Sequence, residues 1–137
     1  MSFDISLVDP VTRESLYMDT PHLMQGATYC LGGTQEMWLS VTYNYSIWYR
    51  KDGVFPDSED GIRSLNGVSG ADSIPILKHA ILALENMTED LSEEERERYE
   101  RRDCTGYWLP TRENAIKPLY SLLAFAKLRP DGIWESD

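Results

Sequence analysis

Cysteines and long apolar runs are scarce in this chain of 137 residues. Its 2 cysteines are too few for a disulfide framework and are expected to be free thiols in a reducing compartment. No apolar run approaches the ~20 residues that a membrane-spanning helix needs, so we expect no membrane contact. The N-terminus, Met-Ser-Phe-Asp-Ile-Ser, has neither a basic region nor an apolar signal core, and we expect a cytoplasmic protein.

Basic residues are also outnumbered. The chain has 13 Lys and Arg against 23 Asp and Glu, which gives a formal net charge of −10. Direct binding to a nucleic-acid backbone needs a basic stripe, and none is visible in the sequence. The acidity fits plain solubility, a basic protein partner, or imitation of the charge of a nucleic acid. Length and composition are those of one globular domain, residues 1–137.

Residue types that carry chemistry form no recognised motif. A zinc site drawn from His22, Cys30, His79 and Cys104 would lack ligand pairs such as Cys-x-x-Cys. Neither cysteine lies in a nucleophile signature, and there is no Gly-x-Ser-x-Gly elbow. The glycines of segment 26–33 fit neither the dinucleotide fingerprint nor the P-loop pattern. We therefore predict neither a metal ion nor a cofactor, name no catalytic residue, and leave enzymatic activity open.

What the chain does have is a long alternating segment, Met37–Tyr49, which predicts a single β-strand. One face of this strand would carry Met37, Leu39, Val41, Tyr43, Tyr45, Ile47 and Tyr49. The other face would carry Trp38, Ser40, Thr42, Asn44, Ser46 and Trp48. We expect the first face to enter the core and the second face to meet water or a partner.

The polar face of this strand is the predicted binding surface, because its hydroxyl and amide groups suit hydrogen bonds to a polar ligand or a protein edge. The candidate residues are Glu36, Trp38, Ser40, Thr42, Asn44, Ser46 and Trp48. Trp38 and Trp48 would lie roughly 33 Å apart along a strand, so they contact one small ligand only if the strand bends. Glu36 beside Trp38 suggests a carboxyl of raised pKa that acts as a general acid, or else an ordinary charge at a sheet edge. Alternatively, the polar face of the strand contacts only solvent and binds no ligand or partner.

Shorter β segments are predicted before this strand. Asp4–Val8 alternates and ends at a turn, and Glu14–Met18 is its expected return strand in a small hairpin. Ala27–Leu31 is a further short strand. Gly32 and Gly33 then supply a flexible turn into the long strand.

The second half of the chain is predicted to be helical. Asp72 or Ser73 caps an amphipathic helix that runs to about Asn86. Ser92 caps an exposed helix over residues 93–102, which is acidic at its start and basic at its end.

The last predicted helix is capped by Thr111 and spans residues 112–128, with a bend at Pro118. It should be the most buried helix, because apolar residues cover much of its circumference. After it, Ile133 and Trp134 are expected to fold back onto the core.

Several blocks of the sequence resemble a family of small uncharacterised proteins found in phages, prophages and bacteria. The blocks are Phe3–Pro10, Gly26–Tyr29 with Gly32–Thr34, Leu39–Ser46, Gly70–Pro75 and Arg129–Trp134. The resemblance spans most of the chain and implies a phage or mobile-element origin. It carries no catalytic role and no site residue.

The expected fold is α+β, with an antiparallel sheet from the N-terminal half packed against C-terminal helices. The expected function is that of a small acidic phage-type protein that acts through protein–protein interaction and inhibits or modulates a host factor in the host cytoplasm. A basic surface is the partner chemistry that the acidity favours. The alternative is a small-molecule binder or small enzyme with a pocket beside the long strand.

Overall fold

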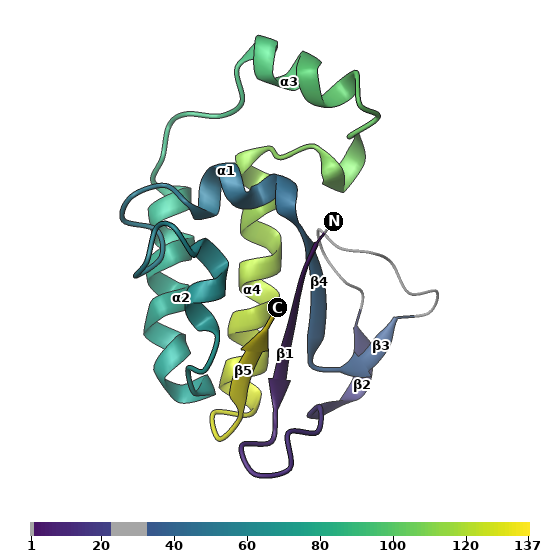
Figure 1. Ribbon diagram of the computed structural model, residues 1–137, viewed down its shortest axis with the longest axis vertical. Coiled ribbons are helices and arrows are strands. Elements are labelled where there is room, and N and C mark those ends of the chain that lie inside the picture. The colour runs from purple at the N-terminus through teal and green to yellow at the C-terminus, as the bar shows by residue number, and fades with distance from the viewer. Residues whose placement is uncertain (1, 23–32) are drawn as a thin grey trace.

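The computed structural model describes residues 2–22 and 33–137. Its main sheet has three antiparallel strands in the order β4-β1-β5. In that order the strands are Trp38–Thr42, Ser2–Val8 and Ile133–Ser136. Two long helices, α2 (Gly70–Glu85) and α4 (Arg112–Leu128), lie side by side behind this sheet (Figure 1). The predicted α+β class, an antiparallel sheet packed against C-terminal helices, is confirmed.

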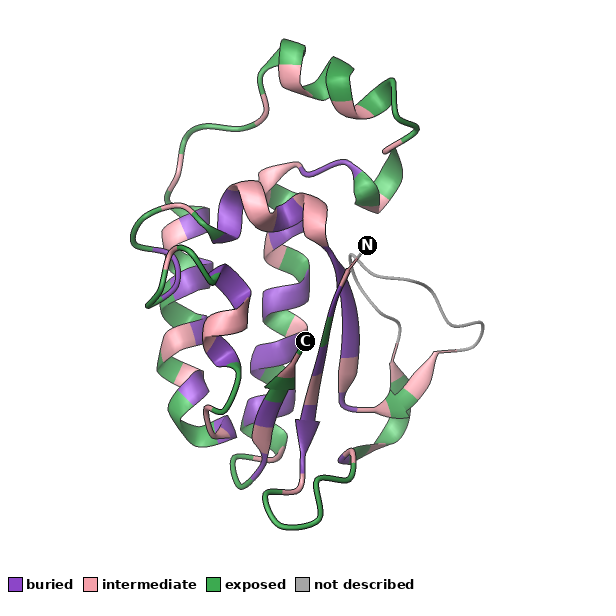
Figure 2. Cartoon of the chain, viewed as in Figure 1, coloured by how far each residue is buried: buried purple, intermediate pink, exposed green. Residues whose placement is uncertain are grey.

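Shorter elements fill the connections between these strands and helices. They are β2 (Tyr17–His22), β3 (Thr34–Glu36), the 3-10 turns η1 (Tyr43–Tyr45), η2 (Gly61–Leu65) and η3 (Gly106–Trp108), and the helices α1 (Ser46–Tyr49) and α3 (Glu93–Glu100). Strands β2 and β3 form a separate antiparallel pair. Helix α3 projects from the end of the molecule and buries none of its residues (Figures 1 and 2).

The core lies between the main sheet and the two long helices. Alternation along β1 turns Phe3, Ile5 and Leu7 inward, since successive side chains of a strand point to opposite faces. Six apolar residues of the two long helices are buried: Leu77, Ile81, Leu84, Leu119, Leu122 and Leu123. Trp134, paired with Leu7 in the sheet, is fully buried, which confirms that the C-terminal segment folds back onto the core.

Helix α2 begins one turn earlier than predicted. Its cap is Ser69, whose hydroxyl accepts a hydrogen bond from the backbone N–H of Asp72 at 3.0 Å. Ser73 lies inside the helix, where its buried hydroxyl donates to the Gly70 carbonyl and accepts from the Trp134 indole at 2.8 Å. Ser73 therefore ties α2 to β5 and does not start the helix.

The other two predicted caps are confirmed. Ser92 starts α3 through a capping box with Glu95, and α3 ends at Glu100, slightly before its predicted end. Thr111 caps α4, whose bounds match the prediction, with Pro118 inside it.

The predicted long strand is wrong beyond Thr42. The chain forms strand only over Trp38–Thr42 and then turns into η1 and α1. Tyr45, Trp48 and Tyr49 are all buried, and their spacing of three and four residues is that of one face of a helix. The alternation of polar and apolar residues along Met37–Tyr49 hid the helical spacing of these three aromatic residues.

The predicted N-terminal hairpin is confirmed only near its turn. There Val8 and Ser15 form an isolated antiparallel bridge, and the backbone N–H of Leu16 donates to the Leu7 carbonyl at 3.1 Å. Beyond this point the chain forms β2, which pairs with β3 and not with β1. The strand predicted for Ala27–Leu31 lies outside the described residues.

Candidate functional site

The seven residues predicted to form a binding face do not share one exposed surface. Ser40, Thr42 and Trp48 are buried, with only 4%, 6% and 2% of their surface exposed. Glu36, Trp38, Asn44 and Ser46 are half-buried. The prediction of one open polar face is wrong for two reasons. Ser40 and Thr42 are buried within β4, and the chain leaves the strand after Thr42, which redirects the later side chains.

Side chains from the segment 44–49 instead bind η3, Pro110 and the first turn of α4. Each of four donates a hydrogen bond to a main-chain carbonyl: Asn44 to Trp108 at 2.8 Å, Tyr45 to Tyr107, Trp48 to Pro110 at 2.8 Å, and Tyr49 to Ala115 at 2.6 Å. Burial raises the pKa of the Tyr45 and Tyr49 hydroxyls, so both remain neutral donors. These four bonds hold the segment 44–49 against the segment 107–115.

Glu36 lies at the end of β3, next to β2. Its carboxylate accepts a hydrogen bond from the Tyr17 hydroxyl at 3.4 Å, and its main-chain oxygen is 2.7 Å from Nε2 of His22. Both contacts link the two strands of the small sheet. A general-acid role for Glu36 stays a prediction.

The His and Cys residues considered for zinc are dispersed. Within the described part of the chain, no three or more His, Cys, Asp or Glu residues lie close enough together to hold a metal ion. His22 and His79 each contact a main-chain carbonyl oxygen, of Glu36 and Gly53 respectively. Cys104 is a half-buried free thiol, and Cys30 lies outside the described residues.

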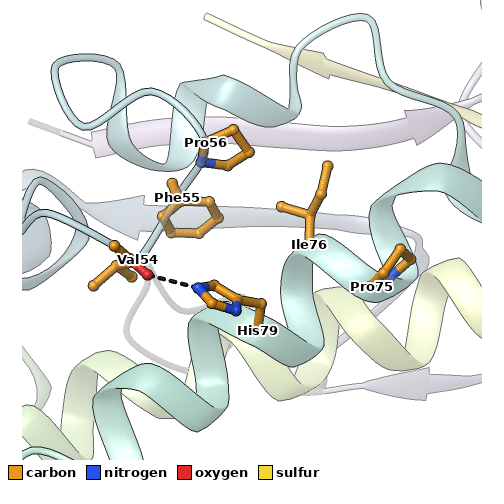
Figure 3. A pocket seen from close by; sticks show the side chains of 7 residues that line it. Val54, Phe55, Pro56, Pro75, Ile76 and His79 are labelled. Atoms are coloured by element: carbon orange, nitrogen blue, oxygen red, sulfur yellow. Dashed lines mark hydrogen bonds between the residues drawn. The ribbon is translucent and has the colours of Figure 1, made fainter.

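An apolar pocket of about 430 Å³ opens between α2 and the loop before η2 (Figure 3). The loop contributes residues 53–56, and α2 contributes Pro75, Ile76 and His79. Val54 and Phe55 are buried, so they form a firm floor, and the Phe55 ring packs edge-on against Tyr49 at 5.8 Å. A concave apolar surface of this size is a common feature of binding sites.

Local sequence explains how the pocket forms. Gly53 has φ +84°, a left-handed conformation that glycine adopts without strain, and this turn carries the chain back toward α2. Nε2 of His79 is 2.7 Å from the Gly53 carbonyl oxygen and joins the loop to the helix (Figure 3). On α2, Asp72, Ile76 and His79 lie on one face, because residues three and four apart are neighbours on a helix.

Three aspartates are close in the chain to residues that line this pocket, but none of them lines it. Asp52 and Asp57 flank the loop residues directly in the chain, and Asp72 precedes Pro75 and Ile76 by one helical turn. All three aspartates are exposed. We call these three aspartates the acidic margin of the site.

No sequence motif marks the residues of this pocket. Val54–Ser58, with Pro56 and polar residues, has the pattern of a loop, and His79 lies on the polar side of its predicted helix. The available signal was Val54-Phe55-Pro56, an apolar triplet between two aspartates, which is unusual for a solvated turn. Nothing in the sequence indicated that this triplet meets α2.

Comparison with protein-family models, with curated proteins and with solved structures gave no match. The resemblance to small phage and bacterial proteins stays a prediction. In the described segments 2–22 and 33–137, no helix has the length and apolar character needed to cross a membrane.

Proposed function

We propose that this chain is a non-enzymatic interaction protein that binds a basic segment of a partner protein. The pocket formed by Val54, Phe55 and Ile76 would receive one apolar side chain of that segment. The acidic margin would attract the basic residues on either side of it.

The observation that carries this proposal is the apolar pocket whose lining residues have the exposed aspartates Asp52, Asp57 and Asp72 nearby in the chain. Apolar anchors buried in pockets supply most of the binding energy of protein interfaces. Complementary charge around them speeds association and selects the partner. The net charge of −10 favours the same basic chemistry over the whole surface.

The resemblance to phage and bacterial proteins favours a host protein as the partner, with inhibition or modulation as the outcome. A small apolar molecule is the competing occupant, since about 430 Å³ lies within the range of ~300–1,000 Å³ typical of small-molecule sites. Among the described residues that line the pocket, His79 is the one titratable side chain. Since general acid–base catalysis commonly needs a second acid or base nearby, this lining favours binding over catalysis.

Selection from a random peptide library tests the proposal. The protein should enrich peptides that carry one apolar residue among lysines and arginines. Ile76→Asp should abolish their binding, because it places a charge in the pocket, and circular dichroism would verify that the variant folds. Asp52→Lys should weaken binding about tenfold, whereas the same change at the exposed Glu93, which does not line the pocket, should have a smaller effect.

Two outcomes would reject the proposal. One is enrichment of acidic or wholly apolar peptides. The other is equal loss of binding in Asp52→Lys and Glu93→Lys, which would show that binding follows net charge and not the pocket. Stabilisation of the fold by small apolar compounds, without any peptide selected, would favour the competing occupant.

A further inference from the structure

A second, smaller pocket of about 240 Å³ has the opposite character. It is lined by Phe3, Tyr43, Ser46, Arg50 and Arg63, which come from β1, η1, α1 and η2. No carboxylate side chain is among these lining residues. Two arginines thus share one small pocket in a chain whose net charge is −10.

Arg63 is held in place by neighbouring groups. Its Nε donates to the main-chain oxygen of Asp137 at 2.7 Å, and one terminal nitrogen donates to the Tyr43 hydroxyl at 3.2 Å. Its guanidinium carbon lies 4.8 Å from the centre of the Phe3 ring. A guanidinium fixed in this way loses little further freedom when it binds a ligand, and its remaining N–H groups are donors.

Arg50 and Ser46 lie one turn apart, at the two ends of α1. Within the described residues, neither side chain makes a hydrogen bond or an ion pair. Gly61 packs against Arg50, since a Cβ at that glycine would lie 3.2 Å from Cγ of Arg50. The guanidinium of Arg50 and the hydroxyl of Ser46 are therefore donors without an acceptor among the described residues.

Arginines elsewhere differ in whether they are paired. In the described part of the chain, Arg13, Arg96, Arg101 and Arg129 form ion pairs with carboxylates, whereas no such pair is formed by Arg98, Arg102 or Arg112, or by Arg50 and Arg63. The side-chain carboxylate of Asp137 accepts from the backbone N–H of Asp4. Arg50 and Arg63 thus bring two cationic side chains to a pocket that no carboxylate side chain of the described residues lines.

We propose that this pocket binds a phosphate group, either free inorganic phosphate or the terminal group of a phosphate monoester. Guanidinium N–H groups match the geometry of phosphate oxygens, and charge-assisted bonds of this kind are the strongest that such a pocket can form. The Ser46 hydroxyl supplies a further donor. The site is independent of the apolar pocket and of any protein partner.

Nuclear magnetic resonance of the ¹⁵N-labelled full chain tests this proposal. Inorganic phosphate and phenyl phosphate are titrated separately, with acetate and sodium chloride at equal ionic strength as controls. Saturable shifts of the Nε–Hε signals of Arg50 and Arg63 are expected with phosphate. Tighter binding of phenyl phosphate would assign the site to a monoester, and equal or weaker binding would assign it to free phosphate.

Arg50→Ala is the main variant, because Arg50 is exposed and its removal leaves the fold intact. It should weaken phosphate binding at least about tenfold, since a hydrogen bond from a charged donor is lost. Lys127→Ala, which removes an exposed cation in the last turn of α4, should leave binding unchanged. Shifts that are linear in concentration, that sodium chloride reproduces, or that persist in Arg50→Ala would overturn the proposal.

Discussion

The phenol of Tyr49 donates a hydrogen bond of 2.6 Å to the main-chain carbonyl of Ala115, and both residues are fully buried. This bond joins α1, a helix of one turn, to the first turn of α4. It also fixes the position of the Phe55 ring, which packs edge-on against Tyr49 and forms part of the apolar pocket. The floor of the pocket is thus connected to α4, one of the two long helices that pack in the core.

Replacement of Tyr49 by Phe should lower the free energy of unfolding by about 1–2 kcal/mol, because a buried hydrogen bond is lost while the ring is kept. Urea unfolding would measure this change. Tyr43→Phe, which alters a half-buried tyrosine, is the matched control and should cost less. Equal stability of Tyr49→Phe and the parent would contradict the structural role given to this bond.

Alkaline pH should destabilise the fold through the same residue. Burial raises the pKa of Tyr49 above its ordinary value of 10.0, so the unfolded chain loses this proton at a lower pH than the folded chain. Above pH ~10 the unfolded state binds fewer protons, and stability should fall by up to about 1.4 kcal/mol per pH unit. Unfolding measured between pH ~8 and ~11 should show a shallower decline in Tyr49→Phe.

Ser73→Ala should destabilise the protein by about 1–3 kcal/mol, because it leaves the buried indole N–H of Trp134 without its acceptor. Thermal unfolding would measure the effect. Ser136→Ala, at a half-buried position in the same strand as Trp134, should change the melting temperature far less. Identical melting of the two variants would argue against the link between α2 and β5.

Ser92→Ala should unfold α3 locally without lowering global stability. Loss of the capping serine costs about 0.5–2 kcal/mol of helix stability. Because α3 buries no residue, this local loss should not affect the rest of the fold. Hydrogen exchange should quicken over Glu93–Glu100 while the melting temperature stays constant. Thr111→Ala makes a comparable change at the cap of the packed helix α4 and should lower the melting temperature. A fall in melting temperature for Ser92→Ala would contradict this account of α3.

The elements that were predicted correctly from the sequence depend on interactions between residues close together in the chain. Thr111 and Ser92 precede helices whose first turns they cap, and a single hydroxyl is enough to mark each start. Ser73 was mistaken for a cap because it also precedes an apolar stripe. Only its contact with Trp134, 61 residues away, reveals its real role.

Non-local contacts account for the remaining errors. Tyr45, Trp48 and Tyr49 fit the pattern of an aromatic strand as well as that of a helical face. Their acceptors lie more than 60 residues later in the chain, at Tyr107, Pro110 and Ala115. The apolar pocket likewise depends on residues 53–56 meeting His79, which no local pattern encodes. Candidate site residues were therefore the least predictable part of the protein.

The most direct test of the central claim is to locate bound peptide by ¹⁵N–¹H chemical-shift mapping. The probe is the most enriched basic peptide from the library selection, and its control is the same peptide with every basic residue replaced by glutamate. The account predicts saturable shifts centred on Val54, Phe55, Ile76 and His79 with the basic peptide alone. Shifts centred elsewhere, or equal binding of the acidic peptide, would contradict it.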